Sequence, residues 1–191
     1  MDENREIITS EIIKVILDWS VFPKQYSGGL ISNLLSRNEP IVDCDGAVIV
    51  ERGYGTNKEY NLVNLEMPSA FESAIIYGGD NIHRNENNEY FIINLSRIPA
   101  DIQTLVFTLD IFKNKCAPNA FGKLELLSIR ILKEGKDEEL CRYDSRISSF
   151  SKARAFSIGA LHRKENGWVF TPEERGFQAT SYEMLMEEFR Q

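Results

Sequence analysis

Residues 153–171 read ARAFSIGALHRKENGWVFT, which is two apolar, β-prone runs on either side of Asn166-Gly167. Asn-Gly between two such runs is a strong signal for a tight hairpin, because both residue types accept the positive φ angles that the favoured hairpin turns need. The stretch therefore predicts a pair of antiparallel strands, Ala153–His162 and Trp168–Thr171, and a β-rich fold.

The same pattern of short apolar runs separated by turn residues continues back along the chain. A first strand is predicted from Ile12 onward, although Ile8, Ile12, Val15 and Ile16 also have helical spacing. Many short strands joined by Gly, Asn and Asp turns predict an antiparallel β-sandwich, a mainly β fold class. The further predicted strands are Ile41–Val50, Tyr60–Leu65, Phe71–Tyr77, Tyr90–Leu95, Thr104–Phe112, Leu124–Leu132 and Glu139–Tyr143.

A short C-terminal helix is the only helix that the sequence predicts with both a start signal and an apolar face. Thr180 and Glu183 have the spacing of a capping box, and Tyr182, Leu185, Met186 and Phe189 fall on one helical face. We expect this helix to cover a sheet edge or an open end of the sandwich.

With 191 residues, the chain is expected to form one domain over 1–191, with residues 23–40 as an insertion or loop.

Composition and charge exclude several classes of function. The formal net charge of −7 disfavours binding to nucleic acid or to an anionic membrane surface. The acidic start of the chain lacks the features of a secretory signal, and no apolar run approaches the length of a spanning helix. Three cysteines without a close pair indicate buried thiols of a reducing compartment. A cytoplasmic protein is expected.

Catalytic motifs are weak throughout the sequence. His83 and His162 are the only histidines, and neither lies near a nucleophile elbow. Gly53-Tyr54-Gly55 begins like a dinucleotide-binding loop, but Lys58 stands in place of the third glycine. The sequence therefore predicts neither enzymatic turnover nor a small-molecule substrate.

Two acidic loops concentrate the oxygen donors that a hard cation prefers. They are Asp43-Cys44-Asp45-Gly46 and Gly78-Gly79-Asp80-Asn81, the second followed by Asn88 and Glu89. Ca²⁺ takes roughly six to eight oxygen ligands from carboxylates and carbonyls, so irregular Asp-rich and Asn-rich loops suit it. In an extended backbone, Asp43 and Asp45 point the same way. The alternative is that these residues cluster because turns need them. Asp110 would supply a further oxygen if it faces the loops.

Several segments spread along the chain match the sequence pattern of one family. They are Ile16–Trp19, Asp43–Ala47, Asp80-Asn81, Leu95–Thr108, Asn119–Ile131, Glu139–Asp144, Gly159–Phe170 and Gly176-Phe177. On these residues, the chain resembles the TerD family of tellurium-resistance and stress proteins from about residue 12 to the C-terminus. The clearest stretch is Leu-Ser-Arg-Ile-Pro-Ala-Asp-Ile at 95–102, close to the family's Leu-x-x-Val-Pro-Ala-Asp-Val.

The resemblance implies a calcium-binding β-sandwich without enzymatic activity, with the loops at Asp43/Asp45 and at 80–89 as metal sites. It also implies a cytoplasmic stress-response role together with other tellurium-resistance-type proteins, some of them in the membrane. Asn87-Asn88-Glu89 stands where family members typically carry Asp-Asp-Glu. Because ligand charge tunes calcium affinity, this difference predicts weaker binding or a single site. The alternative is a diverged, metal-independent scaffold of a resistance or phage-defence assembly.

Overall fold

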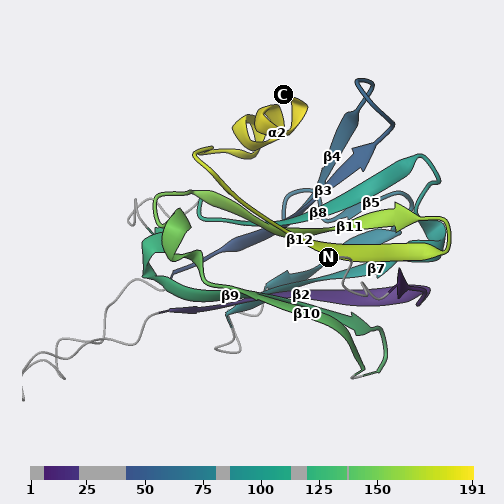
Figure 1. Ribbon diagram of the computed structural model, residues 1–191, viewed down its shortest axis with the longest axis horizontal. Helices are drawn as coiled ribbons and strands as arrows, with labels where there is room; N and C mark the ends of the chain where they lie inside the picture. The colour runs from purple at the N-terminus through teal and green to yellow at the C-terminus, as the bar shows by residue number, and fades with distance from the viewer. Residues whose placement is uncertain (1–6, 22–41, 81–86, 113–119, 137) are drawn as a thin grey trace, which may run out of the picture.

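Two antiparallel sheets packed face to face make up the described part of the protein (Figure 1). The computed structural model describes residues 7–21, 42–80, 87–112, 120–136 and 138–191. Sheet A contains β1 (Ile7–Ile8), β3 (Asp45–Arg52), β4 (Glu59–Val63), β8 (Ile102–Asp110), β11 (Ala155–Lys164) and β12 (Gly167–Phe177). Sheet B contains β2 (Ile12–Val21), β5 (Ser69–Ala70), β6 (Ile75–Asp80), β7 (Asn88–Asn94), β9 (Leu124–Lys133) and β10 (Glu139–Ser145).

The strand order is β1-β12-β11-β8-β3-β4 in sheet A and β10-β9-β2-β7-β6-β5 in sheet B. Neighbouring strands that follow one another in the chain form hairpins, while β8 and β2 lie in the middle of their sheets and pair on both sides. Short 3₁₀ segments, η3 (Leu95–Arg97), η4 (Ala120–Lys123) and η5 (Ile147–Phe150), connect strands at the ends of the sandwich. The predicted antiparallel β-sandwich is confirmed.

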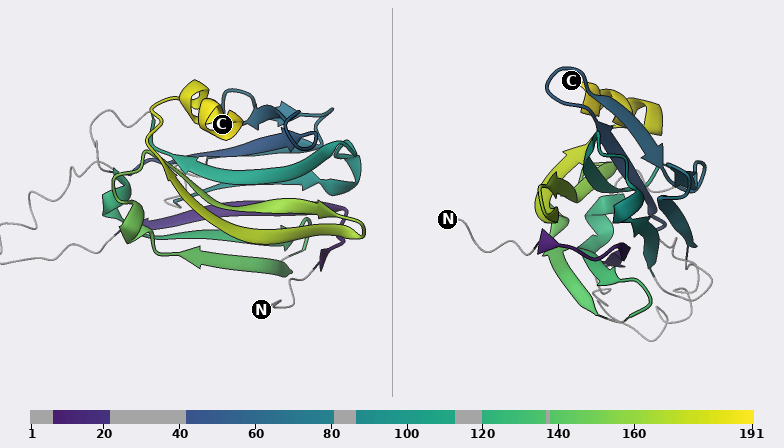
Figure 2. Two further views of the ribbon diagram at one scale, coloured as in Figure 1. Left: turned by 45° about the horizontal axis from the view of Figure 1, so that its top comes forward. Right: turned by 90° about the vertical axis from the view of Figure 1, so that its right-hand side faces the viewer.

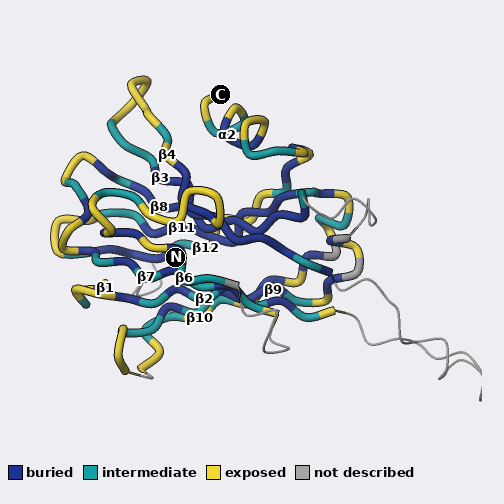
Figure 3. Tube along the Cα trace, turned by 180° about the vertical axis from the view of Figure 1, so that it is seen from behind, coloured by how far each residue is buried: buried dark blue, intermediate teal, exposed yellow. Residues whose placement is uncertain are grey.

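Alternation of buried and half-buried residues is clear in β2, at the middle of sheet B. In β2, Ile13, Val15, Leu17 and Trp19 are buried, whereas the residues between them are only half-buried. Because successive side chains of a strand point to opposite faces, the buried set faces sheet A. Figure 3 shows the result, with buried strand centres between the layers and exposed turns around them. Trp19 and Trp168 both lie in this core.

The predicted hairpin at the C-terminal end is confirmed, with its turn shifted by one residue. Lys164 pairs with Gly167, so Glu165 and Asn166 form the turn and Gly167 begins β12. Gly167 has a φ of 144°, and a Cβ there would lie 2.6 Å from the carbonyl oxygen of Ile8. Glycine is therefore required where β1 approaches β12.

β12 runs well beyond the predicted end at Thr171. The register shifts between Ser157 and Gly159, where Pro172 lies opposite Gly159. A proline is tolerated at such a bulge because the ladder of hydrogen bonds is already interrupted. The strand then continues to Phe177 and leads toward the C-terminal helix.

The predicted strand Phe71–Tyr77 is wrong in its first half. Phe71, Glu72 and Ser73 all have positive φ angles, and the amide of Ala74 donates to the carbonyl of Phe71. These residues form a left-handed turn, so β6 begins only at Ile75. Phe71 is apolar and β-prone, and this character alone did not predict the positive φ angles.

The C-terminal helix α2 (Tyr182–Arg190) exists, but its cap and its place differ from the prediction. Ser181, not Thr180, is the N-cap and accepts from the amide of Met184. Leu185 and Met186 pack on the outer face of sheet A rather than on an edge. Figure 2 shows α2 above sheet A, on the side away from sheet B.

The predicted insertion at residues 23–40 lies outside the described residues. No helix among the described residues is both long enough and apolar enough to cross a membrane.

Candidate metal centre

One end of the sandwich gathers carboxylates from both sheets. At this end β3 begins with Asp45 and β8 finishes with Asp110, and the two residues are register partners on adjacent strands. Only 8% of Asp45 and 1% of Asp110 is exposed. Both lie on the face of sheet A that α2 covers, because Ala47 and Val106, each an even number of residues away, pack in the α2 cluster.

Helix α2 places a phenol against this acidic pair. Burial raises the pKa of Tyr182 far above its ordinary range, and the charge of Asp110 and a hydrogen bond with Asp110 raise it further. The Tyr182 hydroxyl therefore keeps its proton and acts as a donor. Asp110 Oδ1 also accepts from the backbone amide of Phe112 at 3.0 Å. Asp110 is thus held by the backbone of its own strand end and by the first turn of α2.

Glu89 reaches the same end from sheet B. It is the second residue of β7, it is 2% exposed, and its Oε2 accepts from the amide of Gly46 at 2.9 Å. A Cβ at Gly46 would lie 2.9 Å from that same oxygen. Glycine at this position lets a carboxylate of one sheet reach the backbone of the other, so Glu89 links the two layers.

The thiol of Cys44 marks the centre of the acidic end. Burial raises its pKa well above the ordinary value, and the charges of Asp110, Asp43, Glu89 and Asp45 add to the shift. The thiol stays protonated, so it is neither an activated nucleophile nor a competing soft ligand.

Trp19 fixes the segment that carries Asp43 and Cys44. Its indole nitrogen donates to the carbonyl of Val42 at 3.1 Å, and its backbone amide donates to the carbonyl of Asn87. The end of β2 therefore holds the segments before β3 and β7 together. Asp43 itself is half-buried in the irregular segment ahead of β3.

The remaining predicted ligands are Asp80, Asn81 and Asn88. Asp80 is the last residue of β6 and the register partner of Glu89. Asn88 is the register partner of Asp18 and points to the opposite face of sheet B from Glu89, because the two are consecutive in a strand. Asn81 lies outside the described residues. The structure thus places Asp45, Glu89 and Asp110 at one end of the sandwich, with Asp45 and Asp110 on the α2 side of sheet A and Glu89 reaching across from sheet B. Strand geometry turns Asn88 away.

Sequence reasoning missed two polar residues at this end. Tyr182 was predicted only as part of an apolar helix face, and Asn64 was not singled out. Asn64 is 1% exposed, interacts with Tyr182, and accepts from the amides of Glu66 and Met67. The Asn-Leu-Glu-Met-Pro run at 64–68 is a turn signal, but nothing in it indicates a neighbour more than a hundred residues later.

The carboxylate oxygens suit a hard cation, but they do not form a complete coordination site. Within the described ranges, no three His, Cys, Asp or Glu side chains already stand together in an arrangement that could hold a metal ion. Glu89 and Asp110 are instead engaged with backbone amides, as described above. A cation would have to replace some of these hydrogen bonds.

A second polar group, on the outer face of sheet A, places a hydroxyl, an imidazole and a carboxylate in the order of a catalytic triad. His162 Nε2 lies 2.6 Å from Glu173 Oε1, and Nδ1 lies 3.5 Å from Thr104 Oγ1. Thr104 stands inside β8, whose backbone is engaged in ladders with β3 and β11 on both sides. No oxyanion hole can form from those amides, so the arrangement does not support acyl transfer.

The fold and the acidic end define a two-layer β-sandwich with buried carboxylates where β3 and β7 begin and β8 ends. Comparison with known proteins then gives the family. The TerD domain profile matches residues 6–189, and the chain belongs to the TerD family.

Relatives with known names and structures agree with this assignment. The stress response protein SCP2 of Bacillus subtilis (strain 168) is 26% identical over 180 residues, covering 93% of this chain and 88% of that protein. The tellurium resistance protein TerZ of Serratia marcescens is 26% identical over 157 residues, covering 81% and 75%. A crystal structure of a TerD homologue from Streptomyces coelicolor A3(2) superposes with a TM-score of 0.66 at 14% identity, covering 95% and 98%.

Proposed function

We propose that this chain is a non-enzymatic, calcium-binding stress-response protein of the tellurium-resistance type, acting in the cytoplasm through protein partners. The observation that carries the proposal is the burial of Asp45, Glu89 and Asp110 at one end of the sandwich. Buried carboxylates cost free energy unless hydrogen bonds or cations offset their charge. A bound cation would offset several at once.

The chemistry of the residues supports calcium over a transition metal. The donors are carboxylate oxygens, and the nearby thiol is kept protonated by its surroundings. Asp43, Asp45, Glu89 and Asp110 would hold the ion, with Asp80 and Asn81 of the neighbouring loop in the predicted set. An ion here would connect both sheets and the loops, and so would stiffen the surface that a partner meets.

Calorimetric titration and thermal unfolding test the calcium proposal directly. At a hundredfold excess of Ca²⁺ over its dissociation constant, binding to the folded state alone stabilises by about 2.7 kcal/mol. For a chain of this size that raises Tm by roughly 5–11 °C relative to the protein in chelator. Asp45→Asn and Asp43→Asn should reduce both the heat of binding and the Tm shift.

A matched control is Asp101→Asn, which removes one carboxylate just before β8 begins, at the opposite end of that strand from Asp110. The Asp101 side chain is 54% exposed, so its loss should leave calcium binding unchanged. Absence of any calcium heat and any Tm shift in the unsubstituted protein would refute the calcium role.

A metal-independent scaffold is the second candidate, and one observation favours it. Glu89 and Asp110 already accept backbone hydrogen bonds that a cation would have to displace. A metal-independent scaffold would have the same Tm in calcium and in chelator.

The partner part of either proposal is tested by crosslinking in the host. Recovery of tellurium-resistance-type proteins, including those at the inner face of the membrane, would support it. Recovery of the same proteins with an unrelated β-sandwich as bait would contradict it.

A further inference from the structure

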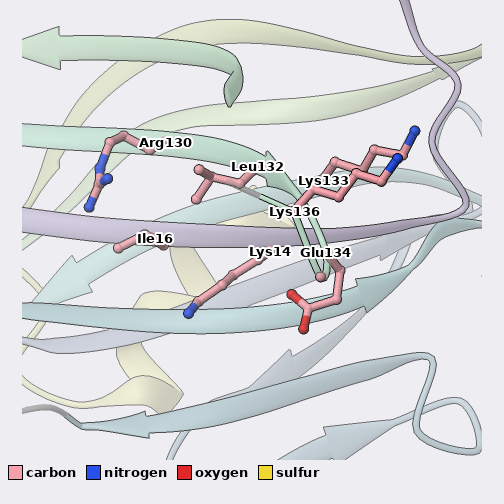
Figure 4. Close-up of a pocket in the computed structure, with 8 residues that line it drawn as sticks. Lys14, Ile16, Arg130, Leu132, Lys133, Glu134 and Lys136 are labelled. Atoms are coloured by element: carbon pink, nitrogen blue, oxygen red, sulfur yellow. The ribbon is translucent and has the colours of Figure 1, made fainter. Parts of the chain in front are cut away.

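The outer face of sheet B carries a groove that the calcium proposal does not use. It lies over β2, β9 and the turn that follows β9, with a volume of about 290 Å³ (Figure 4). Among the described elements, α2 lies on sheet A and leaves this face of sheet B open. The groove is lined by Lys14, Ile16, Arg130, Leu132, Lys133, Glu134, Gly135 and Lys136.

Positive charge dominates the groove although the whole chain has a net charge of −7. Four of its lining residues are basic and one, Glu134, is acidic. Arg130 is committed to Asp18, with Nε 2.8 Å from Oδ2. Within the described part of the chain, Lys14, Lys133 and Lys136 form no ion pair.

The cations stand at both ends of the groove. In Figure 4, Lys14 and Arg130 lie toward one end, and Lys133 and Lys136 lie at the other. The Lys14 ammonium rests 4.3 Å from the centroid of the Tyr90 ring. Such a contact gains about 0.5–1 kcal/mol at exposed sites and about 2 kcal/mol when desolvated, and this half-buried pair lies between the two, so a carboxylate can compete for the ammonium.

Between and beside the cations the surface is aliphatic. Register pairing places Ile76, Ile92, Lys14 and Leu132 in one row across four strands. Ile16 lies two residues along β2 from Lys14 and faces the same way. A ligand that fills the groove therefore meets apolar side chains flanked by ammonium groups.

We propose that this groove docks an acidic, partly apolar polypeptide segment of another protein. Its carboxylates would pair with Lys133 and Lys136 at one end and with Lys14 at the other, and an apolar side chain between them would contact Ile16 and Leu132. Complementary charge of this kind raises association rates and fixes register.

Other occupants fit these observations less well. The volume lies just below the range of about 300–1,000 Å³ that is usual for small-molecule pockets. A second copy packed symmetrically through this face would set its lysines against the same lysines, which is unfavourable. The net charge of −7 opposes approach to an anionic bilayer. A short acidic peptide interacts mainly with the nearby lysines of the groove and less with the net charge of the whole chain.

The test measures binding of a fluorescent peptide of alternating Glu and Leu to the full chain by anisotropy. The affected variant is Lys133→Glu with Lys136→Glu. The matched control is Lys152→Glu with Lys164→Glu, which makes the same charge change at exposed lysines that do not line the groove. Lys14→Gln removes the third ammonium with little change in shape. Circular dichroism and melting curves check that all variants fold.

The expected result is that the groove variant weakens peptide binding at least about tenfold, that Lys14→Gln also weakens it, and that the control binds like the parent. Equal loss in groove variant and control, or no binding by the parent, overturns the proposal. So does binding to vesicles of equal parts phosphatidylglycerol and phosphatidylcholine without binding to the peptide. The assay is run in chelator and in calcium, so its outcome is independent of the calcium proposal.

Discussion

Replacing Glu89 with alanine would remove the carboxylate that links the two sheets at the acidic end. The lost bond is a hydrogen bond from the Gly46 amide to a charged acceptor, 2.9 Å long and buried. Such bonds contribute about 1.5–3 kcal/mol, and the amide left behind would lack its present partner. Relief of repulsion with Asp43, Asp45 and Asp110 offsets part of this loss. The net expectation is about 2 kcal/mol, or a fall in Tm of roughly 4–8 °C.

Glu89→Gln separates the hydrogen bond from the charge. Its side-chain carbonyl can still accept from Gly46, while the negative charge is gone, so the variant should lose less than about 1 kcal/mol. Urea unfolding in chelator, followed by the fluorescence of the buried Trp19 and Trp168, gives both free energies. The reasoning is refuted if Glu89→Ala is as stable as the parent, or if Glu89→Gln is destabilised as much as Glu89→Ala.

Three further predictions concern the helix cap, the pH profile and the bulge. Ser181→Ala should lower the unfolding free energy by about 1 kcal/mol and Thr180→Ala by clearly less, as measured in urea; the reverse order would contradict the observed cap. Burial, followed by a hydrogen bond to a β12 carboxylate, raises the pKa of Tyr143 to about 12 from 10. The Tyr143 phenol therefore ionises at lower pH in the unfolded chain than in the folded one, so the free energy of unfolding falls as pH rises from 10 toward 12. Tyr143→Phe should make this fall shallower, and identical pH profiles of the two proteins would argue against it. Gly159→Ala would put a Cβ 2.5 Å from the Phe170 ring and 2.8 Å from the backbone oxygen of Thr171. A loss of about 1–3 kcal/mol is therefore expected in melting scans, and an unchanged Tm would contradict it.

The sandwich could be predicted because its main signals are local. The alternation of β2 lies within ten consecutive residues, and the Glu165–Gly167 region carries its own turn chemistry. The errors were local too, but they were errors of backbone angle. Phe71 looks like a strand former, yet it and the two residues after it adopt positive φ. Neighbouring hydroxyls at Thr180 and Ser181 offered two caps, and helix packing selected the second.

The acidic end could be predicted only in part, because it is assembled across the two sheets. Asp45 and Asp110 become neighbours because β3 pairs with β8, and the sequence of neither segment predicts this pairing. Tyr182 joins them because α2 folds over the face of sheet A. Conversely, Asn88 and Glu89 look like one ligand pair in the sequence, yet strand geometry sends them to opposite faces.

The short first strand has a consequence for association between molecules. Among the described residues, β1 pairs only with Val169 and Trp168, and no described strand covers that side of β12 beyond them. An open strand edge is a template on which a second chain can add and aggregate. Along this edge the chain places Pro172, which has no amide hydrogen to share, and then the exposed, charged run at 173–175. Pro172 and these charged residues therefore disfavour the addition of a second chain along this edge of β12.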